Sequence, residues 1–123
     1  MLTELLSRAP LLTDGALGTE LQARGLAAGD LPDEWNLCRP EVVGEVIRSY
    51  VEAGSDIILT ATFRANRIAL AAAGLADKLE LINRAGVAVA KRAAGDRARV
   101  FASAGPSGKL MMSGDVTEDE LRA

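Results

Sequence analysis

The stretch PEVVGEVIRSYVEAGSDIILTATF, residues 40–63, joins a helical pattern to a strand pattern and decides the fold class. Its first part repeats apolar residues three and four positions apart, which predicts an amphipathic helix. These residues are Val42, Val43, Val46, Ile47, Tyr50 and Val51. Pro40 is tolerated at the first helical position, and Gly54 supplies the C-terminal stop. Residues 56–62 are then almost continuously apolar, which is typical of a buried parallel strand.

Strand and helix patterns continue to alternate on both sides of this stretch. Upstream, the sequence predicts a strand at 11–13, a turn at 14–18, a helix at 19–24 closed by Gly25, and an irregular segment at 26–39 anchored by Trp35. Downstream, it predicts a loop at 63–66, helices at 68–73 and 77–94, a strand at 100–104, and a GPSG turn at 105–108. Three strand–helix units in series predict an α/β protein, as a doubly wound sheet or as the first part of a barrel.

The end of the sequence predicts the start of one more helix. Thr117 and Glu120 have the spacing of a capping box, and Val116 and Leu121 are placed to form a hydrophobic staple. The chain ends about one turn later, and one helical turn is not stable in water. A (β/α)8 barrel needs roughly 250 residues. We therefore expect a truncated domain, with a frayed tail as the alternative.

Composition narrows the class of protein. Apolar residues make up 49% of the 123 residues and aromatic residues 3%, so a core of Ala, Leu, Val and Ile is expected. A net charge of −3 without a basic run argues against nucleic acid and anionic membranes as partners. One cysteine, no signal-like start and no apolar run of membrane-spanning length favour a cytoplasmic protein.

Two pairs of residues are candidates for a binding site. Asp14 and Gly15 directly follow the first predicted strand, and barrel enzymes carry their chemistry at such strand ends. The alternative is an ordinary turn, where Asp and Gly are both common. Thr60 and Thr62 end the next strand, where alternate residues point to one side, so their hydroxyls are expected to face the same interior. Thr is also simply a good strand former.

A nucleotide-binding module is a further alternative with little support. The DGALG turn at 14–18 lacks the G-x-G-x-x-G pattern of dinucleotide loops, and its aspartate would repel a pyrophosphate. The GPSG turn at 105–108 is not followed by the Lys and Ser/Thr of a phosphate loop.

Three segments, taken in order, resemble the homocysteine S-methyltransferase family, which includes the N-terminal module of cobalamin-dependent methionine synthase and betaine-homocysteine methyltransferase. They are LLTDGALGTELQARG at 11–25, the stretch from DEWNLCRP to RIAL at 33–70, and FASAGPSGKL at 101–110. The resemblance covers about residues 9 to 121. It implies that residues 1–123 form the N-terminal part, about three βα units, of a truncated (β/α)8 TIM barrel that binds homocysteine.

The resemblance also implies roles for individual residues. Asp14 would face the ammonium group of homocysteine, Gly15 and Ala16 would offer backbone N–H groups to its carboxylate, and the threonine region of Thr60 and Thr62 would lie beside that carboxylate. Many relatives read TNTF where this chain reads TATF. Ala61 therefore puts in doubt whether the donor side of the pocket matches the methionine synthase type.

The implied reaction is methyl transfer to the zinc-bound thiolate of homocysteine, giving methionine. The family's zinc is held by three cysteines in the later half of the barrel, and none of them is present here. Cys38 is interpreted as a reduced, half-buried packing residue, because one Cys and no His cannot form a zinc site. The fragment is thus expected to be inactive, with methylcobalamin or S-methylmethionine as candidate methyl donors. A non-catalytic partial barrel that assembles with another chain is the alternative, and self-association through open sheet edges is expected.

Overall fold

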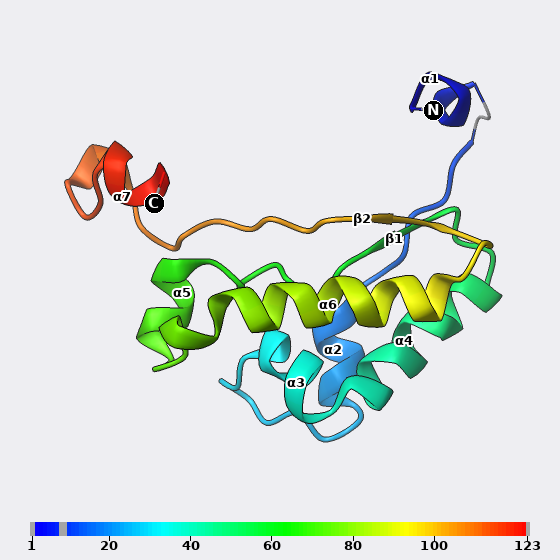
Figure 1. The fold of residues 1–123 in the computed structure, drawn as a ribbon, viewed down its shortest axis with the longest axis horizontal. Coiled ribbons are helices and arrows are strands. Elements are labelled where there is room, and N and C mark those ends of the chain that lie inside the picture. Colours follow the sequence, from blue (N-terminus) through cyan, green and yellow to red (C-terminus); the bar gives the residue numbers. More distant parts are fainter. Residues whose placement is uncertain (1, 8–9, 123) are drawn as a thin grey trace.

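A computed structural model describes residues 2–7 and 10–122 (Figure 1). Residues 1, 8, 9 and 123, which the predicted domain of 1–123 includes, lie outside the described residues. Within the described part, no helix has both the length and the apolar character needed to cross a membrane.

The strands are parallel and lie in sequence order. β1 (Ile57–Leu59) pairs with β2 (Arg99–Phe101), with Ile58 opposite Val100. Thr13 forms a parallel bridge with Ile57 on the other side of β1. Two of the three predicted strands are therefore confirmed, both shorter than predicted, whereas the predicted strand at 11–13 is reduced to the single bridge at Thr13. Beyond β1 the chain turns sharply, because the N–H of Thr62 donates to the carbonyl of Thr60 across 2.8 Å.

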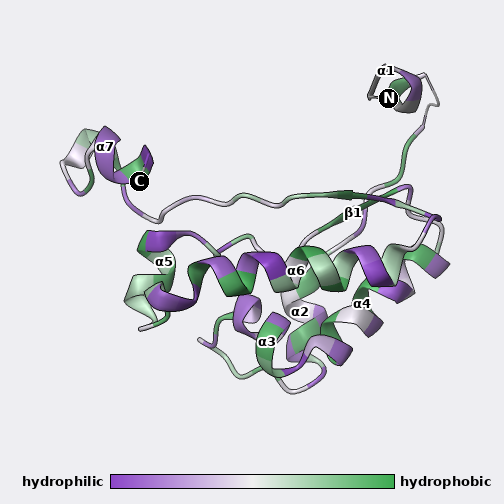
Figure 2. Cartoon of the chain, in the orientation of Figure 1, coloured by the Kyte–Doolittle hydropathy of each residue, from purple (hydrophilic) through white to green (hydrophobic). Residues whose placement is uncertain are grey.

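Two long helices carry most of the packing. They are α4 (Pro40–Glu52) and α6 (Leu79–Ala94), and apolar and hydrophilic residues alternate along both (Figure 2). Gly54 and Gly95 follow them with φ of 104° and 54°, a backbone region that favours glycine. Both helices confirm the predictions, although α6 begins at Leu79 and not at residue 77. Glu80 and Arg84 form an ion pair on α6 at 2.7 Å.

The shorter helices depart more from expectation. They are α1 (Leu2–Leu6), α2 (Leu17–Gln22), α3 (Trp35–Cys38), α5 (Arg67–Ala72) and α7 (Glu118–Arg122). The prediction of an irregular segment at 26–39 was wrong in part, because it contains α3 and a 3-10 turn at Pro32–Glu34. Burial of Trp35 and Asn36 against the helical layer gives this stretch its structure, and that is a tertiary effect.

The core lies between the helical layer and one face of the strands. Its fully buried members come from α2, α4, β1 and α6, and include Leu21, Val43, Val46, Ile58 and Ala90. Small and branched aliphatic side chains dominate this core, as the scarcity of aromatic residues predicted. A second, smaller cluster under α5 contains Leu31, Ala65, Leu70, Leu75 and Ile82.

The opposite face of the strands carries no helix (Figure 1). Four apolar side chains at or beside the strands are between 39% and 57% exposed: Leu12, Leu59, Phe63 and Phe101. The whole chain exposes 7840 Å². A compact protein of 12.9 kDa would expose roughly 6,300 Å². The described residues thus form one covered layer of an α/β architecture and leave the second face of the sheet open.

The predicted capping box is present at the start of α7. The N–H of Thr117 donates to the Glu120 carboxylate at 2.8 Å, and the N–H of Glu120 donates to the Thr117 hydroxyl at 3.3 Å. Val116 is buried, whereas Leu121 is largely exposed. α7 lies apart from the main helical layer, as α1 does at the other end (Figure 1).

We expect the isolated chain to self-associate and to bind the apolar dye ANS, because its strands present an apolar face and unpaired edges. Phe101→Lys, on the open face, should reduce both effects. Leu81→Lys is the matched control, because Leu81 is also an exposed apolar residue but lies on α6. Light scattering and ANS fluorescence measure the two effects. A monomeric wild-type chain that does not bind ANS would contradict this expectation.

Candidate functional site

A cavity of about 270 Å³ opens where the C-terminal ends of the strands meet the turn that leads into α2. Its lining combines apolar side chains with carboxylate, hydroxyl and guanidinium groups. The lining residues are Asp14, Gly15, Leu17, Gly18, Pro32, Asp33, Leu59, Thr60, Ala61, Phe63, Arg64 and Ser103. Three of the five predicted site residues, Asp14, Gly15 and Thr60, therefore line one cavity, whereas Ala16 and Thr62 do not line it.

Asp14 is fixed to β1 by its backbone and by its side chain. Its N–H donates to the carbonyl of Ile57 at 2.9 Å, and its Oδ2 accepts from the N–H of Leu59 at 2.9 Å. Its Oδ1 is buried and has no hydrogen-bond partner among the described residues. A buried carboxylate oxygen without a donor is costly, so this atom is an open acceptor at the cavity.

Burial raises the pKa of the Asp14 carboxyl, and the hydrogen bond from Leu59 offsets part of that rise. The physical cause is loss of hydration, which penalises the charged form. A cation that enters the cavity and meets Oδ1 would lower this pKa again. The carboxyl is therefore electrostatically suited to a positively charged ligand group.

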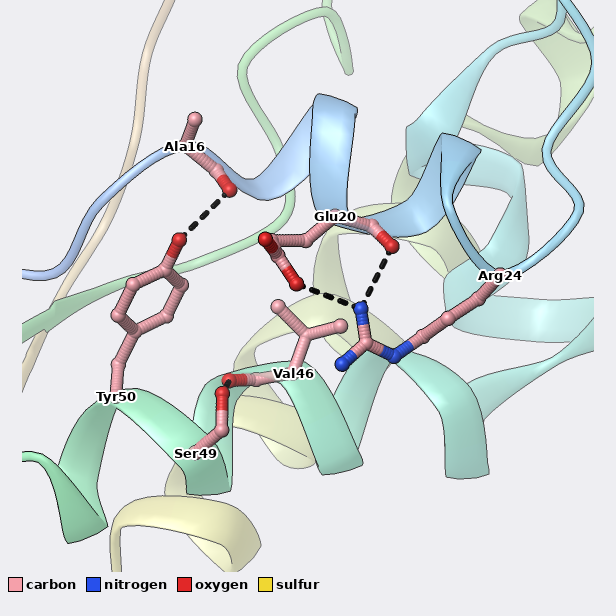
Figure 3. Close-up of polar contacts among 6 residues, drawn as sticks. All are labelled: Ala16, Glu20, Arg24, Val46, Ser49 and Tyr50. Atoms are coloured by element: carbon pink, nitrogen blue, oxygen red, sulfur yellow. Dashed lines mark hydrogen bonds and ion pairs between the residues drawn. The ribbon is translucent and has the colours of Figure 1, made fainter.

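The next two residues of the turn are held by Tyr50 of α4, whose hydroxyl donates to the carbonyl of Ala16 at 2.9 Å (Figure 3). A Cβ atom at Gly15 would lie 3.0 Å from the Tyr50 ring, which explains why glycine suits this position. Among the described residues, the N–H groups of Gly15 and Ala16 form no hydrogen bond. The turn thus offers backbone donors next to the open acceptor of Asp14.

The two threonine hydroxyls are hydrogen-bonded at an Oγ1–Oγ1 distance of 2.6 Å, but both residues follow β1 in the turn and do not alternate along the strand as predicted. Thr62 Oγ1 donates to the carbonyl of Ser103 at 2.8 Å, so its only proton is used. Thr60 must then be the donor to Thr62, while Thr60 Oγ1 accepts from the N–H of Ser103 at 3.0 Å. Thr60 therefore has a lone pair left for a ligand but no proton, which makes it an acceptor.

Asn36 was missed from the sequence, although it is 2% exposed and buried behind the cavity. Its Nδ2 donates to the carbonyl of Ala61 at 2.7 Å, which turns that peptide away from β2. A Cβ atom at Gly86 of α6 would lie 2.7 Å from Thr62 and 2.9 Å from Asn36. Only the absence of a side chain at Gly86 lets α6 pack this closely against the end of β1.

A second carboxylate on the cavity wall, Asp33, was also missed. It is 2% exposed, and its Oδ1 accepts from the N–H of Arg64 at 2.9 Å. Burial raises the pKa of Asp33, and the N–H and the positive charge of Arg64 offset part of the rise. The acidic pair Asp33 and Glu34 before Trp35 could have marked this carboxylate in the sequence. Acidic residues are also common in surface turns, so the pair did not distinguish a cavity from a turn.

Cys38 is exposed, so the prediction of a half-buried packing cysteine was wrong. It ends α3, whose inward positions are taken by Trp35 and Asn36. Within residues 2–7 and 10–122, no three His, Cys, Asp or Glu side chains are grouped so that they could hold a metal ion.

The GPSG turn packs against the loop that follows β1. Asn66 Nδ2 donates to the carbonyl of Pro106 at 3.2 Å. A Cβ atom at Gly105 would lie 2.1 Å from the carbonyl oxygen of Phe63, so only glycine fits there. The turn therefore holds Phe63, which lines the cavity, and so helps to shape the cavity rim.

Comparison with known proteins gives a consistent result. The family model described as homocysteine S-methyltransferase matches residues 11–123. Methionine synthase from Mycobacterium tuberculosis is 36% identical over 121 residues, covering 89% of this chain and 10% of that protein. Homocysteine S-methyltransferase from Escherichia coli is 35% identical over 112 residues, covering 86% of this chain and 34% of that protein.

A solved structure is similar as well. The metallated form of the homocysteine methyltransferase MmuM from Escherichia coli superposes with a TM-score of 0.73 at 30% sequence identity. The match covers 92% of this chain and 44% of that chain. The chain thus spans about a tenth of the methionine synthase and less than half of the shorter relatives.

Asp14→Asn should stabilise the ligand-free chain at pH 7. The folded-state pKa of Asp14 is raised above 3.8, so the folded chain holds this proton more tightly than the unfolded chain. The ionised carboxyl therefore lowers the free energy of unfolding at pH values above its folded pKa, and has no such effect below 3.8. Asn cannot ionise, so the Asp14→Asn chain should have a higher free energy of unfolding than the wild type at pH 7. This difference should vanish at acidic pH, where the Asp14 carboxyl is protonated in both states.

Urea unfolding followed by far-UV circular dichroism, at pH 7 and near pH 3, measures this difference. Asp77→Asn, at an exposed turn, is the control and should change little at either pH. If Asp14→Asn instead destabilises the chain at pH 7, Asp14 serves the turn and not a ligand.

Proposed function

Because the chain belongs to the homocysteine S-methyltransferase family, we propose that its cavity holds the amino-acid end of homocysteine while a methyl group is transferred to the homocysteine sulfur. The observation that carries this proposal is the buried, unpartnered Oδ1 of Asp14 at the cavity. An α-ammonium group supplies both the donor and the positive charge that this oxygen lacks.

In the proposed pose, each charged group of homocysteine meets protein atoms that can still form a hydrogen bond. The ammonium donates to Asp14 Oδ1 and to the remaining lone pair of Thr60. The carboxylate accepts from the N–H groups of Gly15 and Ala16, in the manner of a backbone nest. Thr62 contributes through Thr60, because its own proton is bound to Ser103. In this pose the ligand carboxylate does not face the acceptor atoms of Asp14 and Thr60.

Zinc, which the family resemblance implies, does not fit the described residues. No three potential ligand side chains lie together there, and the one thiol, Cys38, is exposed on α3 outside the cavity lining. We propose that the metal ligands belong to the part of the barrel that relatives possess beyond the matched region. The residues described here bind and orient the substrate but do not activate its thiol, so the 123-residue chain alone is inactive.

We also propose an architecture for this chain and two candidate methyl donors. The parallel strand order, one covered face and the match to 44% of a solved relative support an N-terminal portion of a (β/α)8 barrel. Methylcobalamin and S-methylmethionine both remain candidate donors, since the relatives include a methionine synthase and a homocysteine S-methyltransferase. Ala61 on the cavity wall offers no side-chain amide to either of them.

A second candidate function is a partial barrel that acts only when another chain covers its open sheet face. The observation in its favour is the apolar face formed by Leu12, Leu59, Phe63 and Phe101. A discrete oligomer in solution would support it, whereas disordered aggregation would not.

Asp14→Asn should weaken homocysteine binding by about tenfold or more, because a sheltered charge-assisted hydrogen bond contributes roughly 1.5–3 kcal/mol. Titration of the chain with L-homocysteine, followed by NMR, measures the dissociation constant. Asp77→Asn is again the control for a general effect of charge.

In a form that includes the remaining barrel, the same substitution should raise the Michaelis constant for homocysteine and leave the zinc content unchanged. Homocysteine affinity that is equal in the wild type and in Asp14→Asn would remove Asp14 from the binding site.

A further inference from the structure

Tyr50 reaches the binding turn from α4, thirty-four residues further along the chain. Its hydroxyl donates to the carbonyl of Ala16 (Figure 3), and its ring would lie 3.0 Å from a Cβ atom at position 15. Burial, together with the nearby carboxylates of Glu20 and Asp14, raises the pKa of Tyr50 above 10.0. The phenol therefore keeps its proton at neutral pH and remains a donor.

The two halves of the turn are held by different elements. Asp14 is fixed to β1, through the carbonyl of Ile57 and the N–H of Leu59. The Gly15–Ala16 backbone is held from the other side, by α4 through Tyr50. Loss of the Tyr50 hydroxyl would thus free the backbone at Ala16 and leave the Asp14 carboxylate in place.

We propose that Tyr50 is a positioning residue that holds the Gly15–Ala16 backbone in the arrangement that receives the carboxylate of an amino-acid ligand. This inference rests on the proposed function, in which Asp14 binds the ammonium and the Gly15–Ala16 backbone binds the carboxylate. It assigns the two charged groups of the ligand to two separately supported parts of one turn. α4, which has no residue in the cavity lining, then contributes to ligand selection.

Two ligands separate these parts in one experiment. L-Homocysteine carries both groups, whereas 3-aminopropane-1-thiol is the same molecule without the carboxylate. The chain is titrated with each ligand under reducing conditions, as wild type, Tyr50→Phe and Asp14→Asn. Ser49→Ala is the matched control, because Ser49 is the neighbour of Tyr50 on α4 and its hydroxyl donates within the helix, to the carbonyl of Val46 at 2.7 Å (Figure 3).

Tyr50→Phe should weaken homocysteine binding about three- to tenfold, the effect of one lost hydrogen bond, and leave the aminothiol unaffected. Asp14→Asn should weaken both ligands, and Ser49→Ala neither. Equal weakening of both ligands by Tyr50→Phe, or no weakening of homocysteine, would overturn the assignment.

Backbone 15N relaxation keeps the inference testable apart from ligand binding. In Tyr50→Phe, the order parameters of Gly15 and Ala16 should fall, while those of Ile58 and Leu59 of β1 should not change. Unchanged order parameters at Gly15 and Ala16 overturn the positioning role whether or not the ligand binds. If the wild type binds no homocysteine, the proposed function fails, and greater motion at these two residues alone still supports the role of Tyr50 in the turn.

Discussion

The pairing of residues 12–14 with β1 is the contact on which the cavity depends. The carbonyl of Leu12 accepts from the N–H groups of both Asp56 and Ile57, and the N–H of Asp14 donates back to Ile57. This register places Asp14 beside the end of β1, where Leu59 can donate to its carboxylate. A shift of one residue would turn Asp14 to the other face of the sheet. Backbone pairing therefore determines where the charge lies.

Asp14 Oδ1 and Thr60 Oγ1, two acceptors on the cavity wall, can each still receive a donor. Asp14 Oδ1 has no partner among the described residues, and the Thr60 hydroxyl gives its only proton to Thr62. Such an arrangement lowers the stability of the ligand-free chain, since a buried acceptor without a donor loses its hydration and gains nothing in return. A ligand with several N–H donors and a positive charge would recover that loss, so affinity and instability have the same physical origin.

The two sides of the strands differ, because the helical layer covers one side and no helix covers the other. α4 and α6 bury one side of the strands and support the turn and the end of β1 through Tyr50, Asn36 and the notch at Gly86. The other side remains apolar and exposed, although parallel sheets are usually covered on both faces. The cavity draws on both sides, because Leu59 and Phe63 of the exposed face line it together with Asp14 and Thr60.

The sequence by itself determined the elements whose cause is local. Apolar spacing predicted α4, an apolar run predicted β1, and the Thr117–Glu120 spacing predicted the capping box. Only the tertiary structure decided which groups meet across the chain. The bond from Tyr50 to Ala16, the burial of Asn36, and the exposure of Cys38 depend on packing between distant segments. The direction of the Thr60–Thr62 hydrogen bond likewise depends on Ser103, forty-one residues beyond Thr62, because a hydroxyl has one proton and a distant carbonyl takes it.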